Sequence, residues 1–128
     1  MGLSDSPVST AVAVSDIDRA KEFYEGKLGL SGGKAEVDGG ITYPCADGTT
    51  LHPYPSPDNA GKSGATIAFW TVADVEAMVD ELTAKGIEFE QYSEPFTTDE
   101  KGIARFEGNA AGAWFKDPDG NVLALGSQ

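Results

Sequence analysis

The feature that most constrains this chain is an internal repeat, in which one pattern of strand and helix occurs twice within 128 residues. In the first copy, residues 8–14 (VSTAVAV) read as a strand that leads into a helix beginning near Ser15. In the second copy, residues 65–72 (ATIAFWTV) lead into a helix that Asp74 opens. Because a chain of this length has room for one ordinary domain, the two copies are expected to build it together.

Each copy also ends in the same way. Asp47-Gly48 and Asp119-Gly120 are turn signals, and each precedes a further strand. Each copy therefore reads as strand, helix and then two or three strands, an order that predicts an α+β fold. Neither copy alone can bury both faces of its sheet, so we expect a curled mixed sheet that encloses a cleft. We predict one domain over residues 1–128, with module one at about 8–56, a link at about 53–64 and module two at about 65–126.

The charge balance disfavours several partners. Nine basic residues stand against 21 acidic ones, a net charge of −12, which repels nucleic-acid phosphates and anionic membranes. The first ten residues, MGLSDSPVST, lack a signal-peptide pattern, and no apolar run is long enough to span a membrane. Cys45 is the single cysteine, so an internal disulfide is impossible and a cytoplasmic location is expected.

An acidic stretch in the second half is interleaved with aromatic residues. A strand is expected over residues 87–92, followed by a long loop over residues 97–112 that carries Phe106 and is suited to close over a ligand. The stretch is either a solvated edge or an aromatic-lined mouth for a cation, since aromatic faces and carboxylates both favour positive charge. Its members are Glu88, Phe89, Glu90, Tyr92, Glu94, Phe96, Asp99 and Glu100.

Three segments carry a likeness to a known family: residues 12–30, residues 72–86 and residues 114–125, the last reading WFKDPDGNVLAL. Together with the doubled layout, they resemble the vicinal oxygen chelate superfamily, which includes glyoxalase I, bleomycin-resistance proteins, fosfomycin-resistance transferases and extradiol dioxygenases. The resemblance implies a pair of βαβββ modules whose mixed sheet curls around a ligand cleft, usually in a homodimer.

The resemblance also implies where a metal would be held. Metal-dependent members of the superfamily place His or Glu ligands at positions that here correspond to Ser9, to one of residues 65–67 such as Thr66, and to Ala124. None of these supplies a carboxylate, imidazole or thiolate. The repeat partner of Ala124 is His52, but a stable divalent metal centre usually needs three or more protein ligands. We therefore predict no metal and no cofactor.

Although no metal is predicted, the resemblance implies a ligand cleft. It places Trp114 in the cleft and Phe115 on the helix side, while either Phe69 or Trp70 faces the cleft, depending on the strand register. Small side chains on the first strand, at Ser9 and its neighbours on the same face, leave volume for a ligand. The candidate ligand-binding residues are Ser9, His52, Thr66, Phe69, Trp70, Phe106, Trp114 and Ala124.

Three hypotheses about function follow. The first is a metal-independent, homodimeric protein that binds a small organic molecule, cationic or aromatic, as a bleomycin-resistance protein does. The alternative is a glyoxalase-type lyase or isomerase, or a dioxygenase-like enzyme, that uses His52 and a metal shared across a dimer. The third is an assembly domain without a ligand. No catalytic residue is assigned.

Overall fold

The computed structural model describes residues 2–127. In it, the chain is divided into two compact units. One unit ends at Ser63 and the other begins at Gly64. Each unit contains a four-stranded mixed sheet and few helices, and neither sheet closes into a barrel within the described residues. The α+β class predicted from the sequence is confirmed. Residues 2–127 contain no helix with the length and apolar character needed to cross a membrane.

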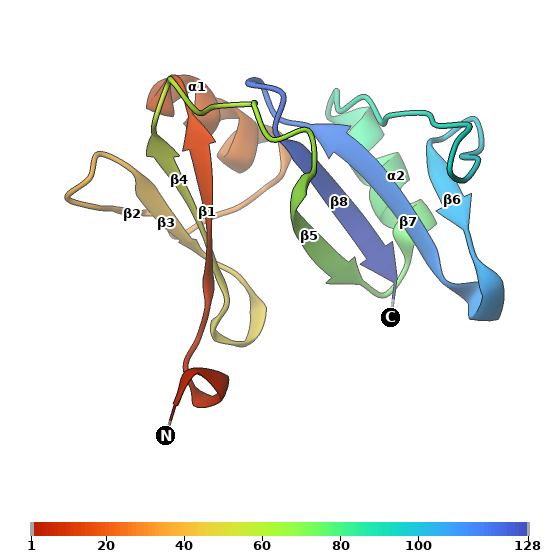
Figure 1. Ribbon diagram of the computed structural model, residues 1–128, viewed down its shortest axis with the longest axis horizontal. Helices are drawn as coiled ribbons and strands as arrows, with labels where there is room; N and C mark the ends of the chain where they lie inside the picture. The colour runs from red at the N-terminus through yellow and green to blue at the C-terminus, as the bar shows by residue number, and fades with distance from the viewer. Residues whose placement is uncertain (1, 128) are drawn as a thin grey trace. The chain divides into compact units, whose positions relative to one another are not determined.

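The first unit is a sheet covered by one interrupted helix. Its strands lie in the order β1-β4-β3-β2, with β1 parallel to β4 and the other neighbours antiparallel (Figure 1). Val12 and Val14 are buried on one face of β1, where the helical residues Ala20, Phe23 and Tyr24 are also buried. The elements are η1 (Leu3–Asp5), β1 (Ser9–Val14), α1 (Ile17–Lys21), η2 (Glu22–Lys27), β2 (Lys34–Ala35), β3 (Ile41–Pro44), η3 (Ala46–Gly48) and β4 (Thr50–Pro55).

The cap of α1 differs from the sequence-based expectation. The Asp16 carboxylate accepts hydrogen bonds from the backbone N–H groups of Asp18, at 3.0 Å, and Arg19, at 3.2 Å. Ser15 instead accepts a hydrogen bond from the Arg19 guanidinium at 3.0 Å. The expected Ser15 cap is wrong because a capping side chain must directly precede the first helical residue to reach the N–H groups of the first turn.

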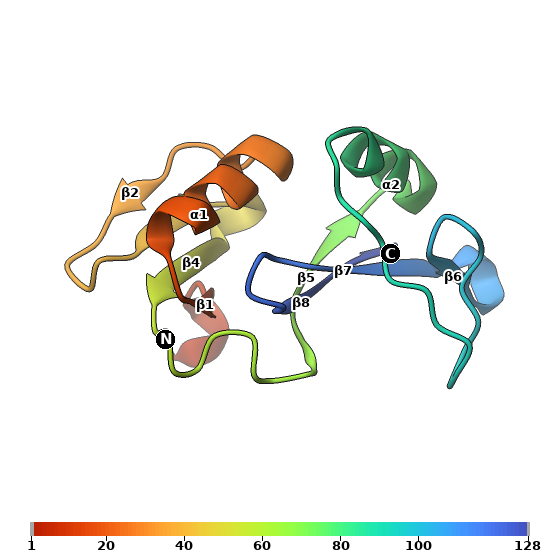
Figure 2. The ribbon, with the colours of Figure 1, turned by 90° about the horizontal axis from the view of Figure 1, so that it is seen from above.

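The second unit repeats the arrangement. Its strands lie in the order β5-β8-β7-β6, with β5 parallel to β8, and α2 covers one face of the sheet (Figures 1 and 2). The Asp74 carboxylate caps α2 by accepting a hydrogen bond from the Ala77 N–H at 3.0 Å, as the repeat predicted. The elements are β5 (Thr66–Val72), α2 (Val75–Ala84), β6 (Ile103–Arg105), η4 (Glu107–Asn109), β7 (Ala111–Lys116) and β8 (Val122–Ser127).

Two expectations about residues 87–112 are wrong. The strand expected over residues 87–92 is a single bridge between Phe89 and Phe115, beside which the Glu90 N–H donates to the Trp114 carbonyl at 2.8 Å. The long loop expected over residues 97–112 contains β6, which pairs antiparallel with β7. Only two apolar residues mark this strand in the sequence, so its pairing with β7 outweighs a weak local signal.

Candidate functional site

An apolar pocket of about 260 Å³ lies on the sheet of the second unit. Phe115 and Leu123 are fully buried in the core, so the residues that alternate with them on β7 and β8 face the other way. Gly112, Trp114, Ala124 and Gly126 on that opposite face line the pocket, and no lining side chain is charged. The lining residues are Thr66, Phe69, Phe106, Ala111, Gly112, Trp114, Ala124, Leu125 and Gly126.

Strand register sets two aromatic side chains on either side of a small one. Ala124 in β8 is the partner of Phe69 in β5 and of Trp114 in β7. Because partner residues lie side by side on one face of a sheet, the three form a row across it. Ala124 is buried between the two aromatic side chains, and all three residues line the pocket.

A register shift in β5 decides which neighbouring aromatic side chain joins this row. The shift lies between Thr66 and Ala68, so Phe69 pairs with Ala124 and Trp70 pairs with Leu125. Phe69 is 69% exposed and lines the pocket, whereas Trp70 is half-buried and lies outside the lining. Alternation from sequence alone could not fix this choice, because a bulge shifts every later side chain of a strand to the other face.

Two of the lining residues, Phe106 and Trp114, belong to a group of four aromatic residues in mutual contact, here called the aromatic cluster. Its other members are Tyr92 and Phe96. Phe96 stacks on Trp114 with ring centroids 4.9 Å apart and planes inclined by 28°. Tyr92 meets Trp114 edge to face at 5.8 Å, and Phe96 meets Phe106 in the same way at 5.6 Å. These contacts fix the plane of the Trp114 indole.

The segment that supplies Phe96 is closed by a pair of hydrogen bonds. The Tyr92 N–H donates to the Thr98 hydroxyl at 2.9 Å, and the Thr98 N–H donates to the Tyr92 carbonyl at 3.0 Å. Burial raises the pKa of the Tyr92 phenol, and the nearby Glu90 carboxylate adds to the effect, so the phenol stays neutral. Sequence reasoning did not assign Tyr92 or Phe96 to the site. Their aromatic character within the acidic stretch was the available signal.

In the first unit, both ring nitrogens of His52 lie within hydrogen-bond distance of other groups of the protein. Its Nε2 lies 2.7 Å from the Asp38 carboxylate, and its Nδ1 lies 3.1 Å from the Ile41 carbonyl. The hydrogen bond from His52, followed by one from the Gly40 N–H, holds the pKa of Asp38 below its usual value. Both ring nitrogens of His52 are therefore engaged within the protein, and neither is directed at a ligand site.

The residues at the superfamily's metal positions do not fit a metal. Ser9 is hydrogen-bonded to the Thr50 hydroxyl, Thr66 offers a hydroxyl, and Ala124 has no donor atom. Divalent metals in such sites are bound by imidazole, carboxylate or thiolate groups. Within residues 2–127, no group of three or more His, Cys, Asp or Glu side chains is arranged to hold a metal ion.

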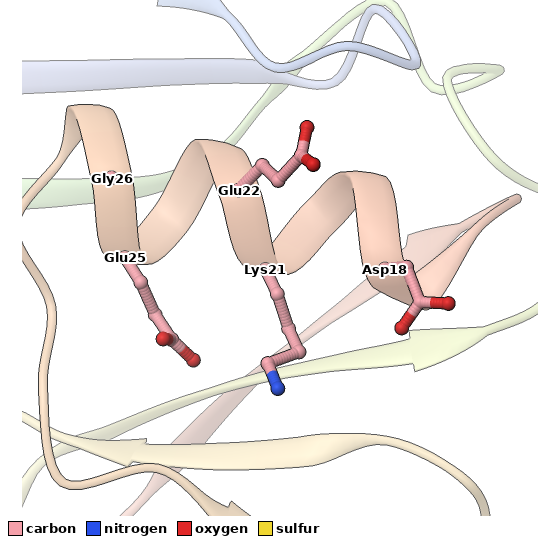
Figure 3. A pocket seen from close by; sticks show the side chains of 5 residues that line it. All are labelled: Asp18, Lys21, Glu22, Glu25 and Gly26. Carbon is pink, nitrogen blue, oxygen red and sulfur yellow. The ribbon is translucent and has the colours of Figure 1, made fainter.

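A second hollow, of about 510 Å³, runs along the helix of the first unit (Figure 3). It is lined by Asp18, Lys21, Glu22, Glu25 and Gly26, all from α1 and η2. Figure 3 shows their charged side chains pointing away from the helix rather than toward one another. The Glu25 carboxylate accepts a hydrogen bond from the buried Tyr43 hydroxyl at 2.6 Å. The hollow is therefore the charged outer face of a helix.

Comparison with protein-family models identifies the family of this chain over nearly its whole length. The model of the glyoxalase/bleomycin resistance protein/dioxygenase superfamily matches residues 6–125. The chain belongs to this superfamily. The resemblance drawn from the repeat and the WFKDPDGNVLAL segment is thereby confirmed. No curated protein matches the chain.

Solved structures of the superfamily share the fold. TnmS3, described as an antibiotic binding protein from Streptomyces sp. CB03234, is 25% identical, with a TM-score of 0.66, over 93% of this chain and 92% of that chain. A glyoxalase/bleomycin resistance protein from Catenulispora acidiphila DSM 44928 is 20% identical, with a TM-score of 0.71, over 95% of this chain and 97% of that chain. The second likeness concerns the fold alone.

Proposed function

We propose that this protein binds a small, flat aromatic organic molecule without a metal, as a drug-binding member of its superfamily. The observation that carries the proposal is the row formed by Phe69, Ala124 and Trp114 across three strands. A flat ring in the pocket would contact the aromatic side chains that line it, Phe69 and Trp114 among them. Aromatic side chains with few polar groups are typical of pockets that bind organic ligands.

The lining favours an aromatic ligand over one recognised by its charge. No charged side chain lines the pocket. Within the acidic stretch, the Glu90 carboxylate lies 3.7 Å from the Lys116 ammonium, which offsets its charge. The net charge of −12 still attracts cations toward the protein, so a positive charge on the ligand would speed binding more than strengthen it.

Metal independence, dimerisation and location belong to the same proposal. The donor-poor residues at Ser9, Thr66 and Ala124 support binding without a metal. Superfamily membership supports a homodimer. The single cysteine supports a cytoplasmic protein. The name of TnmS3 supports an antibiotic as the class of ligand.

The enzyme hypothesis has less support. It requires His52 to donate a lone pair to a metal or a proton to a substrate. The ring nitrogens of His52 face the Asp38 carboxylate and the Ile41 carbonyl instead. The third hypothesis, an assembly domain, leaves the pocket without a role.

The test is a titration with two flat three-ring probes of similar size, neutral 9-anthracenemethanol and cationic proflavine. We expect calorimetry to show saturable binding of both, and binding to quench tryptophan fluorescence. The quenching should be weaker in Trp114→Phe than in the matched control Trp70→Phe, because Trp114 lines the pocket and Trp70 lies outside the lining. Absence of saturable binding for both probes would contradict the proposal.

A further inference from the structure

Gly126 is a glycine that neither the backbone conformation nor the packing of the protein requires. It is part of β8, an inner strand of its sheet, and it pairs with Gly112 in β7 and Thr71 in β5. Glycine weakens the interior of a strand because it has no side chain to pack, and there it often marks a place where another group approaches closely. Gly126 also lines the apolar pocket.

Backbone conformation and packing both permit a larger residue at this position. Gly126 is absent from the glycines with a positive φ, so its backbone suits any residue. A Cβ built on it meets no heavy atom within 4 Å in the described part of the chain, its two chain neighbours aside. Gly112 differs, because a Cβ there would lie 3.2 Å from Cη2 of Trp114. The missing side chain of Gly112 therefore makes room for the Trp114 indole, whereas the missing side chain of Gly126 leaves space within the pocket.

We propose that Gly126 is the specificity-determining residue of the pocket, because its missing side chain admits a flat ring system against the backbone of β8. This inference rests on the proposed function and specifies its ligand. The backbone at Gly126 forms a floor without a side chain, and Trp114, whose indole lies over Gly112, forms a wall beside it. The lining holds no charged side chain, which suits an uncharged ring system.

The size of the pocket narrows the ligand further. Its volume of about 260 Å³ lies just below the range of roughly 300–1,000 Å³ typical of ligand pockets. A neutral, planar system of fused rings fits such a shallow space, and a bulky folded molecule does not. A branched side chain at residue 126 would occupy the same space and exclude the ring.

The test is a graded series at this position, read by calorimetric titration with 9-anthracenemethanol. We expect Gly126→Leu to raise the Kd about tenfold or more and Gly126→Ala to raise it by a smaller factor, as overfilling a packed space does. The matched control is Gly26→Leu, on the helix of the first unit, where a Cβ also meets no heavy atom within 4 Å. Its Kd should equal that of the wild type.

The possible outcomes separate this inference from the proposed function. If the wild type does not bind the probe, the proposed function fails and the inference fails with it. If the wild type binds and Gly126→Leu binds equally well, only the inference is overturned. A changed sedimentation profile of Gly126→Leu with an unchanged Kd would also overturn the inference, because Gly126 would then be part of an interface between two copies of the chain. If Gly126→Leu does not fold, the Kd of Gly126→Ala decides.

Discussion

Phe96 and Trp114 lie 18 positions apart in the sequence, yet their rings stack with centroids 4.9 Å apart. Trp114 belongs to a strand, and Phe96 belongs to the segment that Tyr92 and Thr98 close by hydrogen bonds. The segment therefore serves as a support for one face of the indole. Because the indole also lines the pocket, its orientation determines the shape that a ligand meets.

The first prediction concerns this support. Phe96→Ala should weaken binding of 9-anthracenemethanol by about 0.5–1.5 kcal/mol, the usual contribution of an aromatic pair, because the indole would no longer be held in one plane. Calorimetry measures the change. Phe96→Tyr keeps the ring and should bind like the wild type. Equal affinities for the alanine and tyrosine variants would contradict a positioning role.

The second prediction concerns the wall itself. Trp114→Ala should weaken binding of flat aromatic probes by about 1–3 kcal/mol, as loss of an aromatic anchor usually does. Circular dichroism and a melting curve must first show that the variant is folded, because Trp114 also contacts Phe96 and Tyr92. A folded variant with unaltered affinity would show that the ligand binds elsewhere.

The third prediction concerns metals. Dialysis against a chelator should leave both the melting temperature and the probe affinity unchanged, because Ser9, Thr66 and Ala124 supply no metal-binding side chain of the usual kind. Elemental analysis of protein purified without added metal provides a second measurement. A melting temperature that falls on chelation and recovers with Zn²⁺, Ni²⁺, Fe²⁺ or Mn²⁺ would refute metal-independent binding.

The sequence predicted the elements with strong local signals. The doubled strand and helix, the Asp74 cap and the α+β class all followed from hydrophobic periodicity and turn residues. The bulge in β5 could not be predicted, because it arises from pairing with β8 and leaves no mark in the order of apolar residues. Likewise, the contact of Phe96 with Trp114 depends on how a loop folds back, which spacing alone does not encode.

The last prediction concerns pH. The His52 side chain, hydrogen-bonded at 2.7 Å, and the Gly40 N–H lower the pKa of Asp38 from its ordinary 3.8. A carboxyl group whose pKa is lower in the folded state adds stability above its unfolded pKa and loses that contribution as the pH falls through the folded value. The difference in melting temperature between the wild type and Asp38→Asn should therefore be present above about pH 4 and shrink below it. Asp58→Asn, at an exposed position of the same unit, is the matched control and should follow the wild type throughout. A difference between Asp38→Asn and the wild type that stays constant down to pH 2 would show that the Asp38–His52 contact does not contribute through the charge of Asp38.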